Sequence, residues 1–220
     1  MNAAVLRSMG FSVPIDGSEN AGAPQRKAVD AIAVIRDEHR SLCAVLHGML
    51  YLIREIRFAA AAPRFDVFHA MLDYIDAFPE RFHHPKEDAY LFNFLSVRHS
   101  DAVPLIDRLR AEHAIGAEKI RQLADALTRY EADGARAFAR FAGAAAAYAA
   151  FHYSHMRAEE DELIPLARKY LTTDDWKAID AAFAGNADPL IGIEAGAQYI
   201  DLFRRIVNIA PPPIGVGPDR

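Results

Sequence analysis

Apolar residues recur at steps of three, four and seven over most of the chain, which is the spacing of one face of an α-helix. The second of these apolar stripes, about residues 66–97, contains Pro79 and Pro85, so we expect its helix to be kinked or split. Four amphipathic helices joined by short connections predict an all-α fold, an up-down-up-down four-helix bundle. The stripes cover about 26–58, 66–97, from about Pro104 to the Asp133-Gly134 pair, and from there to about Tyr170.

The segments on either side of this predicted bundle (26–170) have a different composition. Residues 1–25 are rich in Gly, Pro, Ser and Asn and predict a flexible arm, and the tail 211–220 (PPPIGVGPDR) predicts disorder. In the extension 171–210, one short helix is expected to begin at Thr173 and another to span about 190–208. We therefore expect one or two additional C-terminal helices. They are candidates for covering one end of the bundle or for a subunit contact, such as that of a homodimer.

Charge and cysteine content narrow the class of protein. A formal charge of −5 gives no general attraction to nucleic acid or to an anionic membrane. The single cysteine, Cys43, excludes an internal disulfide framework and suits a reducing compartment. No apolar run approaches the ~20 residues that cross a bilayer, and the start MNAAVLRSMGF lacks the apolar stretch of a secretory signal. We expect a cytoplasmic protein with neither a nucleic-acid nor a membrane partner.

Four of the nine histidines lie on the apolar stripes, one on each predicted helix. Steps of four and seven stay within ~40° and ~20° of one helix face, so these imidazoles are expected to point inward. Burying several imidazoles without partners would cost several kcal/mol per group. A transition metal such as iron offsets that cost, because imidazole suits it as a ligand. The four residues are His39, His83, His113 and His155.

Two of these histidines are followed four residues later by a glutamate in similar contexts. FHHPKEDAYLFN carries His83 and Glu87, and HYSHMRAEEDELIP carries His155 and Glu159. Residues four apart are neighbours on one helix face, so each pair can reach a single inward site. Together with one histidine from each of the two remaining helices, these pairs supply four imidazole nitrogens and two carboxylates. Since a carboxylate can bridge two metals, this set predicts a dinuclear centre.

Further polar residues lie close to these positions in the sequence. His152 is a candidate ligand or, preferably, an outer partner of the ligands, and His84 is expected on the helix surface or in the same outer role. Tyr148 shares the face of His155 and is a candidate hydrogen-bond donor near the cluster, or a core residue. Several others are expected to take no part: His47, His69 and His99 without function, Glu38, Glu112 and Glu160 solvated, and Cys43 packed as a small apolar group.

Four segments, RDEHRSL, FHHPKEDAYLF, RAEHAIGAEKI and HMRAEEDELIP, resemble the hemerythrin family, the HHE cation-binding domain, in the family's order over roughly residues 28–170. The resemblance implies a non-haem centre of two iron ions (Fe²⁺/Fe³⁺) with an oxo or hydroxo bridge. Glu87 and Glu159 would bridge the irons. The terminal ligands would be His39 and His83 on one iron, and His113 and His155 on the other.

One position departs from the oxygen-carrying members, which place two histidines four apart on the third helix. Here the residue four after His113 is Ala117. Each iron would then have five ligands, and both would be open to an added one. The resemblance therefore implies binding of, or reaction with, a small ligand (dioxygen, nitric oxide or hydrogen peroxide) in sensing or stress response. Enzymatic turnover and the redox partner stay open, and the same ligands accept other divalent metals.

Two alternatives belong to other classes. A ferritin-like di-iron oxidase or iron-storage protein uses Glu-x-x-His pairs, and the only such pair here is Glu80 with His83. A metal-free helical interaction module would carry no stoichiometric metal. A zinc hydrolase lacks its His-Glu-x-x-His signature.

Overall fold

The structure, a computed structural model, describes residues 30–184, and every regular element in that range is helical. Three short π-helical segments and one 3₁₀ turn interrupt the α-helices. The π segments are Pro79–His83, Glu87–Phe92 and Glu159–Leu163, and the 3₁₀ turn is Ser100–Ala102. The α-helices are α2 (Ala31–Phe58), α3 (Phe65–Ala77), α4 (His84–Lys86), α5 (Asn93–Arg98), α6 (Val103–Asp133), α7 (Ala135–Ala158), α8 (Ile164–Tyr170) and α9 (Thr173–Phe183).

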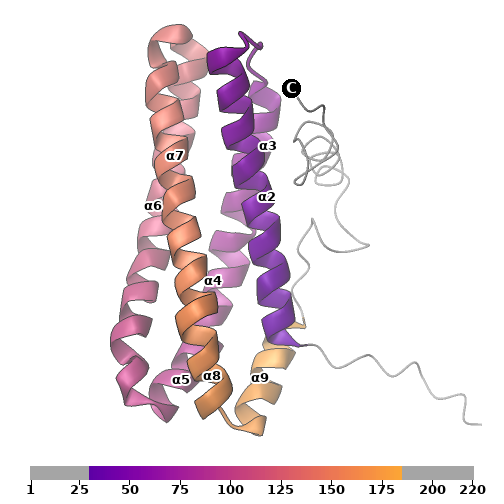
Figure 1. The fold of residues 1–220 in the computed structure, drawn as a ribbon, viewed down its shortest axis with the longest axis vertical. Helices are drawn as coiled ribbons and strands as arrows, with labels where there is room; N and C mark the ends of the chain where they lie inside the picture. Colours follow the sequence, from indigo (N-terminus) through magenta and orange to yellow (C-terminus); the bar gives the residue numbers. More distant parts are fainter. Residues whose placement is uncertain (1–29, 185–220) are drawn as a thin grey trace, which may run out of the picture.

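These elements form four antiparallel rods, the first being α2, the second α3 to α5, the third α6 and the fourth α7 with α8 (Figure 1). The all-α four-helix bundle is thus confirmed, and α9 is an additional helix after it. The second helix expected beyond the bundle (190–208), the arm 1–25 and the tail 211–220 lie outside the described residues. The domain boundaries stay predictions.

Two of the rods are broken close to prolines. The second rod is split at Pro79, as expected, because proline has no N–H to donate. The fourth rod, predicted as one helical stretch to about Tyr170, widens into a π turn over Glu159–Leu163 just before Pro165. Such turns insert one residue and rotate the following side chains, and they are frequent at functional sites.

The apolar core is divided into two clusters along the bundle axis. One packs the half of the bundle near the α2–α3 and α6–α7 connections, and in it the rings of Phe68 and Phe141 lie edge to face. The other packs the opposite half and includes Phe92 and Phe183. On α2, the buried polar residue His39 lies between Ile35 of the second cluster and Leu42 of the first. A layer of polar side chains therefore separates two apolar halves.

Helix α9 covers the end of the bundle at which α2 begins (Figure 1). Asp180 Oδ1 accepts a hydrogen bond from the backbone N–H of Ala31 at 3.0 Å, which satisfies one of the free donors at the α2 N-terminus. The Phe183 ring lies edge-on to the ring of His83, with centroids 6.3 Å apart. Helix α9 thus closes the end of the bundle next to His83, a predicted metal ligand.

Asp175 fixes α9 in this position. It completes a capping box with Thr172 and accepts two hydrogen bonds from Arg98 of α5, at 2.8 and 3.0 Å. These bonds, that of Arg98 first, hold the pKa of Asp175 well below its usual value. A depressed carboxylate pKa stabilises the fold above the ordinary Asp pKa of about 3.9, and this stabilisation is lost as the pH falls below it.

We expect Asp175→Asn to lower the free energy of unfolding by about 1–2 kcal/mol at neutral pH, the range for loss of a helix cap. Urea melts at pH 7 and at about pH 3 would measure this, with the difference from wild type shrinking at the acid pH. Asp174→Asn is the matched control, because that exposed side chain binds only Lys177 among its described partners. Equal losses in both variants would contradict the role of Asp175.

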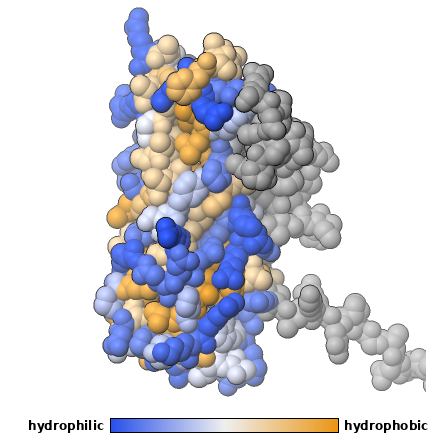
Figure 2. Space-filling view, in the orientation of Figure 1, coloured by the Kyte–Doolittle hydropathy of each residue, from blue (hydrophilic) through white to orange (hydrophobic). Residues whose placement is uncertain are grey.

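On the face seen in Figure 2, hydrophilic side chains predominate over the half of the bundle that holds α8 and α9. The other half shows more apolar surface. Within residues 30–184, no helix has both the length and the apolar character needed to cross a membrane.

Candidate metal centre

All six side chains predicted as metal ligands lie together in the polar layer between the two apolar clusters. Among the described residues they form two groups of four potential metal-binding side chains, within which the ligand atoms lie no more than 4.8 Å apart. The groups share Glu87 and Glu159. One is completed by His39 and His83, and the other by His113 and His155. The sequence-based convergence is therefore observed, whereas the role of each residue as a ligand stays a prediction.

The two shared carboxylates occupy equivalent places in the chain. Glu87 and Glu159 are each the first residue of a π-helical segment, and each follows a histidine of the cluster by four residues. Glu159 directs Oε2 toward His39 Nε2 at 3.3 Å, and Oε1 toward His155 Nε2 at 3.2 Å. One oxygen thus faces each group, which is the arrangement that a bridging carboxylate requires.

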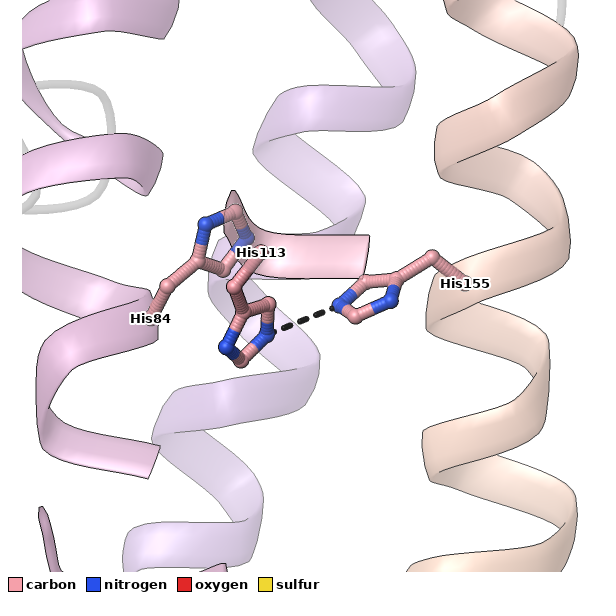
Figure 3. A group of neighbouring side chains, drawn as sticks. All are labelled: His84, His113 and His155. Atoms are coloured by element: carbon pink, nitrogen blue, oxygen red, sulfur yellow. Dashed lines mark hydrogen bonds between the residues drawn. The ribbon is translucent and has the colours of Figure 1, made fainter. Parts of the chain in front are cut away.

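Glu87 lies on the other side of the same space. Its Oε2 is 3.4 Å from His83 Nε2, in the first group, and 3.6 Å from His113 Nε2, in the second. Within the second group, His113 Nε2 and His155 Nε2 approach to 3.0 Å (Figure 3). Ligand atoms from all four rods therefore face one small volume.

The donor set fits metal ions and is poorly satisfied by the protein alone. None of the six side chains is more than 7% exposed. Both oxygens of Glu87 and of Glu159, together with Nε2 of His39 and of His83, are buried without a hydrogen-bond partner among the described residues. Leaving such groups unpaired costs several kcal/mol each. Cations that accept these lone pairs would remove that cost, and nitrogen and oxygen donors together suit iron.

Each of the four histidines turns its other ring nitrogen, Nδ1, to a carboxylate on a different helix. The pairs are His83 with Glu38 (2.6 Å), His39 with Glu160 (2.8 Å), His155 with Glu112 (2.8 Å) and His113 with Asp88 (3.1 Å). A carboxylate on Nδ1 fixes the tautomer and the orientation of the ring, so that Nε2 is presented to a metal. This is the arrangement expected around metal-binding histidines.

The prediction that Glu38, Glu112 and Glu160 are solvated is wrong for Glu38, which is 4% exposed. Glu112 and Glu160 keep 22% and 35% of their side chains exposed, but all three contact a histidine of the cluster. The sequence did contain a signal, because these acids and Asp88 each directly precede or follow a predicted ligand. A side chain next to an inward-pointing residue is rotated ~100° around its helix, which aims it at the neighbouring helix.

The carboxylates shift the titration of the buried histidines. Burial lowers the pKa of His113, but the hydrogen bond with Asp88 and the nearby carboxylates of Glu159 and Glu87 outweigh it and raise the value to about 9. Burial likewise favours a high pKa for Glu159, yet the surrounding histidines, His155 first, hold it well below its ordinary value. A metal entering the site must displace protons from such histidines, so its binding will strengthen as the pH rises.

The three residues considered as outer partners are all buried. His84, expected on the surface or in an outer role, is 5% exposed and stacks on His113 with ring centroids 4.2 Å apart. His152 is buried beside His155, and burial lowers its pKa to about 3. The Tyr148 hydroxyl donates to Glu80 at 3.3 Å, and Glu80 also lies 3.4 Å from His84 Nδ1. The surface placement of His84 is thus wrong, and Glu80 is a buried neighbour of the cluster that the sequence did not reveal.

Glu80 is a carboxylate whose side chain is buried, with 5% exposed. Burial raises its pKa to about 7, and the hydrogen bond from Tyr148 only partly opposes this. Gly116 on α6 lies against it, since a Cβ there would be 3.0 Å from Glu80 Oε1. The missing side chain at position 116 leaves room for this carboxylate between the helices.

The histidines expected to have no function lie apart from the cluster. His47 packs against Tyr153, His69 binds Glu131 on the surface, and His99 stacks on Tyr170. Cys43 is half-buried and packs against the first apolar cluster, as expected.

A small cavity lies beside the first group of donors. It has a volume of about 10 Å³, the least that holds one water-sized molecule. A much larger surface groove of about 490 Å³ lies between α2 and α7, the helices nearest the viewer in Figure 1. His39 and Met156 line both spaces. The cavity is lined by Glu38, His39, Leu42, Phe78, Pro79, His83, His84 and Met156.

Comparison with known proteins gives one match. The family model described as the hemerythrin HHE cation-binding domain matches residues 30–167, the span from the start of α2 into α8. Comparisons with curated proteins and with solved structures found no match. The matched span covers three rods in full and the fourth rod into α8, and it contains all six converging side chains, so the chain belongs to the hemerythrin HHE cation-binding family.

Proposed function

We propose that the protein is a non-haem di-iron protein that binds, or reacts with, a small ligand such as dioxygen, nitric oxide or hydrogen peroxide. The observation that carries this proposal is the pair of four-residue groups sharing two carboxylates. Each group has its own pair of histidines, which favours two metals over one. The match to a family of cation-binding domains supports metal binding at this place. A role in sensing or in stress response follows from the reactivity of such ligands with iron.

Different residues would contribute to this function in different ways. His39 and His83 would hold one metal, His113 and His155 the other, and Glu87 and Glu159 both. The carboxylates on Nδ1 would keep the four rings oriented. Two irons bound there would supply electrons, one or two at a time, to a small ligand.

The negative charge of the surrounding side chains favours metal ions of high positive charge at this site. Six carboxylates surround the four histidines, and their formal charge is −6 when all are ionised. Two Fe²⁺ or Fe³⁺ ions carry +4 to +6, which offsets most or all of it. The six are Glu38, Glu87, Asp88, Glu112, Glu159 and Glu160.

Access for a small ligand is provided by the cavity beside His39 and His83. Its volume of about 10 Å³ suits a molecule the size of one water and not an organic substrate, so a diatomic ligand would enter only as the lining side chains move. Met156, which lines both the cavity and the outer groove, separates the cluster from solvent on this side. Its flexible, apolar side chain can move aside for a diatomic molecule while excluding bulk water.

The contacts of Glu80 give less support to the ferritin-like alternative than to the proposed site. That reading uses Glu80 and His83 as a Glu-x-x-His pair on one metal. Glu80 instead faces Tyr148, His84 and His152. The chain also belongs to the hemerythrin HHE family.

The test is metal analysis combined with optical spectroscopy of the protein reconstituted with iron. We expect about two irons per chain and, after oxidation, near-ultraviolet absorption that changes on adding azide. Reduction should bleach this absorption, and dioxygen or nitric oxide should alter it again. Binding of less than one metal per chain under these conditions would overturn the proposal.

A further inference from the structure

A surface groove of about 490 Å³ lies between α2 and α7, outside the cluster of donors (Figure 1). Its volume falls in the range of roughly 300–1,000 Å³ that small-molecule sites occupy. His39, a predicted ligand of one metal, forms part of the lining together with Met156. A molecule that sits in the groove beside His39 would therefore be separated from that metal by a single imidazole.

The formal charges of the groove lining cancel, because it contains two arginines and two acids, Arg40, Arg157, Glu160 and Asp161. Arg157 and Asp161 pair with each other 3.2 Å apart. Glu160 lies 2.8 Å from His39 Nδ1. Since interfaces select partners of complementary charge, this lining favours a neutral ligand over a strongly charged one.

Each of the two helices contributes one aromatic ring to the lining. The rings of His47 on α2 and Tyr153 on α7 have centroids 5.2 Å apart and are tilted by 32°. Ala44, three residues before His47 on the same helix face, has the smallest side chain of the lining and leaves space beside them. Aromatic rings attract a further ring in offset or edge-to-face contact. The groove therefore suits a flat aromatic molecule.

The Tyr153 hydroxyl is a hydrogen-bonding group that the protein leaves unused. Its oxygen is buried and has no hydrogen-bond partner among the described residues. Burial raises the pKa of Tyr153 to about 12, so the group keeps its proton and is a donor at neutral pH. An unpaired buried hydroxyl costs free energy, and a ligand oxygen that accepts its proton would offset that cost. The neutral His47 ring has one acceptor nitrogen, which can take a hydrogen bond from a ligand hydroxyl.

We propose that the groove binds a hydroquinone, a neutral aromatic ring with two hydroxyl groups, as the electron donor of the metal centre. The inference rests on the proposed di-iron function, because reduction of a small ligand consumes electrons that must be replaced. The ring would lie against His47 and Tyr153, with one of its oxygens toward the Tyr153 hydroxyl. His39 would connect it to the nearer metal.

The step is a two-electron oxidation of the hydroquinone. Its two O–H bonds break, its two electrons reduce two Fe³⁺ to two Fe²⁺, and its two protons pass to water in the groove. The product is a quinone, which leaves through the open side of the groove. The cavity of about 10 Å³ on the other side of His39 and Met156 is too small for an aromatic ring, so the donor stays outside the cluster.

Binding is measured first, by anaerobic calorimetry of the metal-free protein with naphthohydroquinone as the probe. We expect one molecule per chain, and no tighter binding of a negatively charged, sulfonated derivative. Ala44→Phe fills the groove and should weaken binding at least ~10-fold, because a steric clash discriminates against the ligand. Tyr153→Phe removes only the hydroxyl and should weaken binding roughly 3–10-fold, the usual effect of one hydrogen bond. Tyr90→Phe is the control, since Tyr90 lies on the second rod and is 38% exposed.

Electron transfer is measured next, on the oxidised, iron-loaded protein without dioxygen. The rate at which naphthohydroquinone bleaches the near-ultraviolet absorption should saturate near the Kd found by calorimetry. At one low concentration of the donor, this rate should fall at least as much as the affinity does in Ala44→Phe and Tyr153→Phe. Tyr90→Phe should match wild type.

The possible outcomes separate this inference from the di-iron function. Equal Kd values for wild type, Ala44→Phe and Tyr153→Phe, or no binding to a wild type that takes up two irons, would overturn the hydroquinone site and leave the di-iron function standing. Binding in the groove without reduction of the loaded centre would overturn the role of the ligand as electron donor. Binding by a protein that takes up less than one metal per chain would overturn the di-iron function, and the redox role with it.

Discussion

Replacing Glu159 by alanine is expected to abolish the two-metal centre. This carboxylate is 1% exposed and belongs to both groups of donors. Its two oxygens face His39 on one side and His155 and His113 on the other, at 3.2–3.6 Å. Its removal takes one ligand from each metal and leaves two cations repelling one another with only Glu87 between them. Iron content should therefore fall from two per chain to one or none.

The same variant should lose the stabilisation that metal gives to the fold. A ligand that binds only the folded state at 100 times its Kd stabilises by about 2.7 kcal/mol. Wild-type protein should show a higher melting temperature with Fe²⁺ under anaerobic conditions than with a chelator, and Glu159→Ala should not. Glu162→Ala is the matched control, because Glu162 lies in the same π segment but is exposed. Two irons retained in Glu159→Ala would reject the shared-carboxylate assignment.

The second large effect is expected at Glu38, which touches no metal in the proposed site. Its Oε2 lies 2.6 Å from His83 Nδ1, and both side chains are almost fully buried. Glu38→Gln removes the charge that orients this imidazole and makes it a better donor. Loss of such a partner typically lowers metal affinity 10–100-fold. Competition with a calibrated chelator would measure the change.

The neighbouring Asp37 provides the control for this prediction. It lies one residue earlier on α2 and pairs with Arg40 on the surface, so Asp37→Asn should leave metal affinity unchanged. Glu160→Gln is expected to have a smaller effect than Glu38→Gln, because Glu160 is 35% exposed and water can replace its carboxylate. Equal affinities of Glu38→Gln and Asp37→Asn would show that the contact with His83 does not tune the site.

Much of the fold and of the candidate site could be predicted from the sequence, because both depend on helix periodicity. The stripes that carry Ile35, Leu42 and Leu46 on α2 also carry His39, so the same spacing that predicts the helix predicts an inward histidine. Spacing of four residues similarly placed Glu87 with His83 and Glu159 with His155. These relations hold within one helix, where sequence separation fixes the angle between side chains.

Contacts between helices could not be predicted in the same way. Glu38 and His83 are 45 residues apart, and Glu112 and His155 are 43 apart. Whether such residues meet depends on the rotation and axial shift of one helix against another, which periodicity along a single helix leaves undetermined. For this reason Glu38 was wrongly predicted to be solvated, and the contacts of Glu112 and Glu160 with the histidines were not predicted, although each acid directly adjoins a ligand in the sequence.

The sequence alone determined that this chain forms four amphipathic helices and that four histidines and two glutamates point inward. Only the tertiary structure decided which carboxylate faces which imidazole, that the two shared glutamates begin π-helical turns, and that His84 and Glu80 are buried beside the cluster. The reason is that side-chain direction within a regular helix is set by local backbone geometry, whereas π turns and helix–helix register are set by packing across the whole bundle.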